Sequence, residues 1–219
     1  MKSRFFLRAL PFLIIVGGIL FASAGRLYLP MFWVYLGVVL SFVIIAIAVL
    51  DPGLLQERIR PGPGGKDRYL RLLALPFILC HWIVAGLDVG RFHWSDTMPF
   101  ALQIVGAVGL ASGMAISIWA MAVNPFFSPV VRIQSERGHR LITSGPYRFV
   151  RHPGYLGAVM SCVFGMCILG SLYAMLPIGV LLLLMLRRAK LEDRFLHEEL
   201  EGYREYAQRV RYRLIPGLW

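Results

Sequence analysis

Charged residues are scarce in this chain of 219 residues: Asp, Glu, Lys and Arg make up 16% of it, whereas 58% is hydrophobic. A soluble domain of this length needs a larger polar surface. The chain instead contains several apolar runs close to the ~20 residues that a helix needs to cross a bilayer. These observations argue against an ordinary soluble domain and predict an all-α, polytopic integral-membrane helical bundle.

Acidic residues are fewer than basic ones, 12 against 23, and the formal net charge is +11. In a membrane protein, Lys and Arg in loops are first a signal of topology, so we expect no nucleic-acid partner. Only three cysteines occur, Cys80, Cys162 and Cys167, all in apolar stretches without a C-x-x-C motif or a nearby histidine at ligand spacing. We therefore expect reduced thiols, no disulfide and no metal site.

The apolar runs predict about six membrane segments. A run of 33 residues, 154–186, would form a helix of ~50 Å, which is too long for a ~30 Å hydrocarbon core. Gly170, Ser171 and Pro177 lie near its middle. We therefore expect a tight helical hairpin, with arms short enough to tilt or to stop short of a full crossing. The predicted segments are 8–27, 31–50, 69–87, 99–123, 154–170 and 173–188.

The basic residues predict the orientation of this bundle. With six segments, one side receives the N-terminus, the loops 51–71 and 124–151, and the tail after 187. Only Arg26 and Arg91 of the 23 Lys and Arg residues lie on the other side. The positive-inside rule then places both termini in the cytoplasm. The first residues also have the basic start and apolar middle of a signal peptide, but we expect them to remain as the first span.

The stretch GPYRFVRHPGYLG, residues 145–157, concentrates charge and backbone breakers between apolar runs. Gly145-Pro146 indicates a turn, and Pro153 suits the first position of a helix. A helix that begins here, flanked by Arg151 and His152, could hold an anion such as a carboxylate or phosphate. The alternative is that Arg148 and Arg151 are topology charges or lipid anchors, with His152 structural.

A family resemblance favours the functional alternative. Residues 124–157, NPFFSPVVRIQSERGHRLITSGPYRFVRHPGYLG, and residues 187–218, RRAKLEDRFLHEELEGYREYAQRVRYRLIPGL, resemble the isoprenylcysteine carboxyl methyltransferase family of integral-membrane methyltransferases. The string G-x-Y-x-x-x-R-H-P-x-Y-x-G, combined with a late acidic cluster, Y-x-x-Y and R-x-I-P, makes the match specific. The chain then divides into N-terminal transmembrane spans, 1–123, and a methyltransferase core, 124–219, that contains the cofactor loop, the hairpin and a cytoplasmic C-terminal helix.

The resemblance implies that S-adenosylmethionine binds at the cytoplasmic face and that a lipophilic or prenylated substrate enters from the bilayer among membrane lipids. The helix start could hold the methionine carboxylate, and tyrosine faces could meet the sulfonium. No Gly-rich Rossmann loop is present, so this site has to be built from the loop and its helices. The implied cofactor contacts are Gln134, His139, Arg140, Leu141, Ile142, Tyr147, His152, Pro153, Gly154, Tyr155 and Glu192.

The resemblance also implies the catalytic residues. The family has an arginine four residues before a paired acidic motif, which reads here Glu192-Asp193. With a one-residue gap the arginine is Arg188, and without it the arginine is Arg187. This arginine would hold a substrate carboxylate with two hydrogen bonds, and Glu192 would orient the arginine or the cofactor's ammonium. We expect no metal to be needed.

The substrate stays open at this stage. An isoprenylated cysteine carboxylate, or a similar isoprenoid acid or thiol, fits the resemblance best. Related membrane methyltransferases act on phospholipid amines, and sterol reductases of similar architecture bind NADPH near a comparable site. A channel, a transporter or a non-catalytic scaffold are further alternatives. The spans hold almost no ionisable residues, which weakens transport, and a scaffold would not explain the His, Tyr and Arg pattern of one loop.

Overall fold

The protein folds into a bundle of long helices without strands in the part of the chain described by the computed structural model, residues 2–65, 67–96 and 98–219. Side chains 2–9, 68 and 71 lie outside this description. The α-helices are α1 (Lys2–Ala24), α2 (Pro30–Val49), α3 (Pro52–Ile59), α4 (Arg68–Leu87), α5 (Phe100–Val123), α6 (Pro153–Leu169), α7 (Met175–Glu199) and α8 (Tyr203–Arg209).

Among the residues that the structure describes, three helical segments are long and apolar enough to cross a membrane: Pro30–Val49, Leu72–Phe92 and Phe100–Val123. Leu10–Ala24 and Pro153–Leu169 are shorter apolar helices. Large apolar side chains remain exposed on the outside of the bundle, as expected for helices that face lipid. The fold is therefore that of a helical membrane bundle.

Helices α5 and α6 make the most extensive contact between described helices, and glycines line it. A Cβ on Gly113 would lie 2.7 Å from the carbonyl oxygen of Gly157, and a Cβ on Gly157 would lie 2.4 Å from that of Gly113. Gly106 and Gly109 likewise leave room for Ile168 and Phe164. Small residues of this kind allow helix backbones to pack tightly in a membrane. The pair forms a rigid base for the loop that connects its members.

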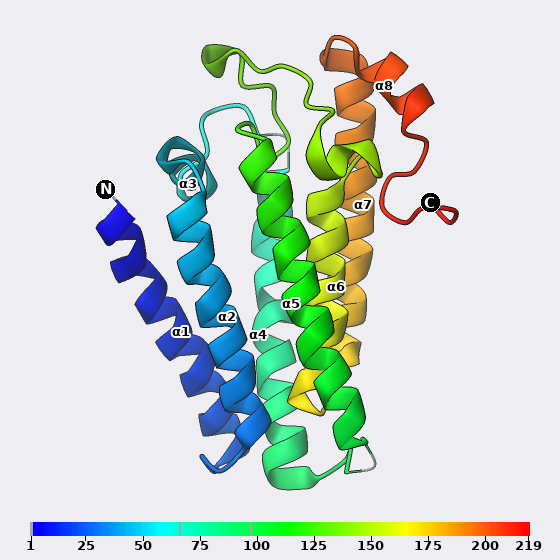
Figure 1. Ribbon diagram of the computed structural model, residues 1–219. Coiled ribbons are helices and arrows are strands. Elements are labelled where there is room, and N and C mark those ends of the chain that lie inside the picture. Colours follow the sequence, from blue (N-terminus) through cyan, green and yellow to red (C-terminus); the bar gives the residue numbers. More distant parts are fainter. Residues whose placement is uncertain (1, 66, 97) are drawn as a thin grey trace.

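The polar segments gather at one end of the bundle. Figure 1 shows α3, the loop 124–152 and α8 together at that end, where the chain also begins. At the opposite end, α4 continues into a π-helical turn, Asp88–Phe92, and a short turn at 170–174 joins α6 to α7. Helix α7 extends well past the predicted end of its apolar run and carries polar residues into the first of these two ends.

Candidate functional site

A cavity of about 430 Å³ opens at the polar end of the bundle. Its polar wall comes from the loop 124–152, the first turn of α6, the last part of α7, and α8. Its other part reaches between α4, α5 and α7. The apolar residues of α4 and α7 that line this deeper part are Leu70, Ala74, Ile78, Leu181, Leu184 and Met185. The cavity therefore suits a ligand with one polar and one apolar end.

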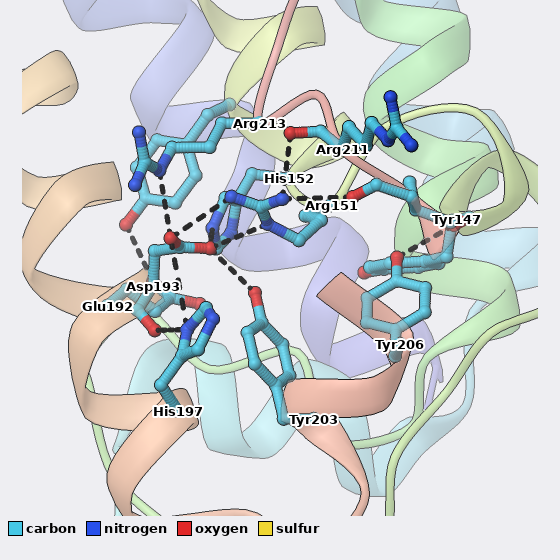
Figure 2. A network of polar contacts seen from close by, with 12 residues as sticks. Tyr147, Arg151, His152, Glu192, Asp193, His197, Tyr203, Tyr206, Arg211 and Arg213 are labelled. Atoms are coloured by element: carbon cyan, nitrogen blue, oxygen red, sulfur yellow. Dashed lines mark hydrogen bonds and ion pairs between the residues drawn. The ribbon is translucent and has the colours of Figure 1, made fainter. Parts of the chain in front are cut away.

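Asp193 on α7 organises one side of the site (Figure 2). Its carboxylate is 1% exposed and accepts hydrogen bonds from four side chains. The donors and distances are Arg151 Nε at 2.8 Å, His152 Nε2 at 3.1 Å, Tyr203 OH at 2.9 Å and Arg213 Nε at 2.8 Å. Burial raises the pKa of Asp193, but the hydrogen bonds from His152, Arg151 and Arg213 outweigh burial and bring it well below its usual value.

The same cluster ties the C-terminal tail to the loop. The Arg151 guanidinium also donates from Nη1 to the carbonyls of Val210 and Arg211, each at 2.9 Å. The backbone N–H groups of residues 151 and 152 donate to the carbonyls of residues 212 and 213. Tyr206 on α8 donates to the Tyr147 carbonyl at 2.7 Å. These bonds hold the α8 tyrosines against the cavity wall.

The structure corrects one expectation about the start of α6. Arg151 and His152 were expected to flank a helix start that holds an external anion. Both side chains instead bind Asp193, and they are 7% and 4% exposed. The anion that they hold is a carboxylate of the chain itself, because a buried arginine needs a close counter-charge.

A second polar group lies next to the Asp193 cluster, where the Tyr155 ring meets the edge of the His152 ring. Tyr155 donates its hydroxyl to Glu192 Oε2 at 2.7 Å, and the Arg188 guanidinium lies 5.7 Å from the centre of the Tyr155 ring. Arg188 Nη2 donates to the Pro129 carbonyl at 2.7 Å, and its Nε lies 2.6 Å from Asp67 Oδ2. Tyr155, Arg188 and Glu192 thus line the cavity together, and Asp67 of the α3–α4 connector contacts Arg188 without lining it.

The loop wall is fixed by a buried ion pair. Arg132 donates from Nε and Nη2 to the two carboxylate oxygens of Glu57 on α3, each at 3.0 Å. Ser128 adds a hydrogen bond to the same carboxylate. Burial would raise the pKa of Glu57, but the bonds from Arg132 and Ser128 lower it. The carboxylate therefore stays ionised and anchors the loop to the N-terminal half.

His139 shows how the loop presents a ring to the cavity. Its ring stacks on Phe126 with centroids 4.6 Å apart, and its Nδ1 accepts a hydrogen bond from the Gln134 backbone N–H at 3.2 Å. Burial first, then the charges of Arg132 and Arg137, lower the pKa of His139. The imidazole is therefore neutral at pH 7, with its proton on Nε2.

Most residues predicted from the sequence line the cavity: His139, Arg140, Leu141, Ile142, Tyr147, His152, Gly154, Tyr155, Arg188 and Glu192. Gln134, Pro153 and Arg187 are also described, but they do not line it. Gln134 is fully buried and binds the Phe126 carbonyl and Arg137, whereas Arg187 is exposed. Of the two candidate arginines, only Arg188 faces the cavity.

Several functional contacts were missed by sequence reasoning. Asp67 lies in the loop 51–71, which was used only for the topology argument, and Asp193 was passed over in favour of its neighbour Glu192. Tyr203 and Tyr206 also line the cavity. Their Y-x-x-Y spacing was noted as a motif, and with helical periodicity it does place both rings on one face.

Comparison with known proteins finds a family match for part of the chain. Residues 105–198 match the isoprenylcysteine carboxyl methyltransferase family. This segment is similar to members of that family. The match covers most of α5, the cavity loop, α6 and nearly all of α7, and so carries most of the cavity wall.

Three curated relatives show how far the similarity extends. A probable protein-S-isoprenylcysteine O-methyltransferase of Oryza sativa subsp. indica is 36% identical over 112 residues, which are 50% of this chain and 59% of that protein. The cobalt-zinc-cadmium resistance protein CzcN of Cupriavidus metallidurans is 24% identical over 143 residues, 61% of this chain and 58% of CzcN. A mouse delta(14)-sterol reductase is 33% identical over 102 residues, 44% of this chain and 24% of the reductase. The chain thus spans less than two thirds of each relative.

Proposed function

We propose that this protein transfers a methyl group from S-adenosylmethionine to the carboxylate of an isoprenylated cysteine or a similar isoprenoid acid. The observation that carries the proposal is Arg188, which faces a cavity that is polar at one end and apolar at the other. Its Nη1 makes no hydrogen bond or ion pair with any residue that the structure describes. A carboxylate with a lipophilic tail matches both features, since Arg binds planar oxyanions in a fixed geometry.

The cavity residues fit the proposed cofactor. The aromatic faces of Tyr147 and Tyr155 suit a sulfonium cation, and the Glu192 carboxylate suits an ammonium group. Backbone groups of residues 139–142 lie along the same wall and can meet an adenine. When bound, S-adenosylmethionine supplies an electrophilic methyl group. The rice relative's name gives independent support, because it describes an O-methyltransferase of isoprenylcysteine.

The residues of the chain would act chiefly by positioning. A substrate carboxylate is already ionised at neutral pH, so no general base is required. Arg188 would orient it, and Tyr155 would hold Glu192 through the bond between their side chains. Burial of the lipophilic tail between α4 and α7 would fix the distance between the reactants. Such alignment is worth up to ~7–11 kcal/mol of the barrier.

We further propose that six segments cross or enter the membrane, with both termini and the cavity at the cytoplasmic face. The arrangement in Figure 1 supports this, because the basic loops and the tail gather at one end. Arg26 and Arg91 lie at the other, where they bond to backbone carbonyls, Arg26 to that of Val89 and Arg91 to those of Ala22 and Ser23. The positive-inside rule assigns the more basic end to the cytoplasm.

A cofactor panel tests the proposal. Purified protein is titrated with S-adenosylmethionine, its demethylated product and NADPH, and the thermal shift is recorded. We expect stabilisation by the first two compounds and none by NADPH. Stabilisation by NADPH alone would favour a reductase, in line with the similarity to the sterol reductase. No response to any of the three would favour a scaffold.

A further inference from the structure

Asp67 lies outside the family segment, yet it reaches the site. It follows the glycines of the α3–α4 connector directly before α4 and is 3% exposed. Its Oδ1 accepts a hydrogen bond from the Val131 backbone N–H at 2.7 Å. Its Oδ2 lies 2.6 Å from Arg188 Nε, as an ion pair in which neither atom has an aligned hydrogen bond. One carboxylate therefore links the N-terminal half, the cavity loop and α7.

The position of Asp67 decides which edge of Arg188 is open. A guanidinium has a side edge, formed by Nε and Nη2, and an end edge, formed by Nη1 and Nη2. Glu57 occupies the side edge of Arg132, and Asp193 occupies that of Arg151. The Nη1 atoms of both arginines are also bonded within the chain. In Arg188 the side edge meets Asp67 and the Pro129 carbonyl, but Nη1 has no partner among the described residues.

We propose that Asp67 is a positioning residue that holds the side edge of Arg188 and so presents the end edge to the substrate carboxylate. This inference rests on the proposed function. It assigns part of the site to the N-terminal half of the chain, outside residues 105–198. Without the contact to Asp67, the Arg188 side chain would sample several rotamers, because fixing a long side chain costs conformational entropy.

The charge of Asp67 gives the proposal a distinctive kinetic signature. In Asp67→Asn the side chain keeps its shape but loses a negative charge close to the substrate carboxylate. Repulsion of an acidic substrate falls, so KM should stay equal or decrease. The loss of alignment should lower kcat about 10-fold to 100-fold. A merely structural role would instead raise KM and reduce the fraction of folded protein.

The experiment compares the parent, Asp67→Asn and Asp96→Asn in steady-state methyl transfer to a farnesylated cysteine analogue with a free carboxylate, over a range of substrate concentrations. Asp96 is an exposed carboxylate at the opposite end of the bundle and serves as the matched control. Binding of the demethylated cofactor is titrated in parallel. We expect a lower kcat without a higher KM for Asp67→Asn, cofactor affinity within 2-fold of the parent, and parental behaviour for Asp96→Asn.

A double-mutant cycle with Arg188→Lys shows whether Asp67 acts through the arginine. Contacting residues in one network are not additive. The double variant should be no slower than Arg188→Lys alone. Additive losses, or a parental kcat for Asp67→Asn, would overturn the proposal.

Two further outcomes keep the test decisive. If Asp67→Asn does not fold, Asp67→Glu retains the charge but moves the carboxylate by one methylene, and a parental kcat for this variant would overturn the proposal. If the parent itself transfers no methyl group, the proposed function fails first, and this result is distinct from a fault in the Asp67 inference alone.

Discussion

Replacement of Asp193 by Asn should destabilise the protein severely, because it removes one charge from a buried cluster. Asp193 is 1% exposed, and its main partner Arg151 is 7% exposed. A buried ion pair that loses one member typically costs 3–5 kcal/mol, since the other charge stays buried without a partner. Arg151 keeps its bonds to two backbone carbonyls, so we expect the lower end, about 3 kcal/mol.

The assay is reversible unfolding in mild detergent, followed by circular dichroism. For a chain of this length, a loss of about 3 kcal/mol lowers Tm by about 6–12 °C. The matched control is Asp96→Asn, an exposed carboxylate that should change the free energy of unfolding by less than about 0.5 kcal/mol. Tyr203→Phe removes one hydrogen bond to the same carboxylate and should give an intermediate loss of about 1.5–3 kcal/mol.

The pH dependence provides an internal check on this reasoning. The pKa of Asp193 is lowered in the folded state, so its charge stabilises the fold above the unfolded pKa of about 3.9. That stabilisation is lost as the pH falls through the lower, folded value. The difference between the parent and Asp193→Asn should therefore be constant above about pH 5 and shrink below about pH 4. A variant as stable as the parent at pH 7 would refute the role assigned to this cluster.

Three further predictions concern the site and the orientation. Arg188→Lys should lower single-turnover methyl transfer about 10-fold to 100-fold with little change in cofactor affinity, whereas Arg187→Lys should match the parent; the reverse result would restore the ungapped alignment. Burial and the charges of Arg132 and Arg137 lower the pKa of His139, so acidification that protonates the ring should weaken binding of S-adenosylmethionine more than binding of the demethylated product, which lacks the sulfonium charge. An unchanged affinity ratio in calorimetric titrations between pH 7.5 and 5 would contradict this. A cysteine at Ser171 should be labelled from the non-cytoplasmic side, and labelling only from the cytoplasm would contradict the orientation.

Much of the fold follows from simple patterns in the sequence. The predicted spans 31–50, 69–87 and 99–123 are confirmed as helices α2, α4 and α5, and Pro153 does begin α6. These elements are predictable because long apolar runs and N-terminal prolines act locally. Helix α3 was not predicted, although Asp51 caps its first turn and Pro52 begins it. The cytoplasmic helix predicted after the hairpin is in part continuous with α7, which runs to Glu199.

Site residues could be predicted where they lie in a sequence motif. They could not be predicted where they contact residues that are distant in the sequence. The stretch 145–157 marked the cavity wall, but nothing in the local sequence shows that Asp67 would meet Arg188, 121 positions later. Gln134 shows what a motif leaves unspecified. Its place in the family pattern implied a cofactor contact, whereas its side chain is buried against Phe126 and Arg137 and shapes the loop. Such roles depend on tertiary contacts that a sequence pattern does not specify.

The most direct test of the central claim is methyl transfer itself. Purified protein is given S-adenosylmethionine labelled on its methyl group, together with a farnesylated cysteine analogue that carries either a free carboxylate or the corresponding amide. The account predicts a base-labile methyl ester on the acid and no label on the amide. Label on a phospholipid amine, or no transfer to the acid by protein that binds the cofactor, would contradict it.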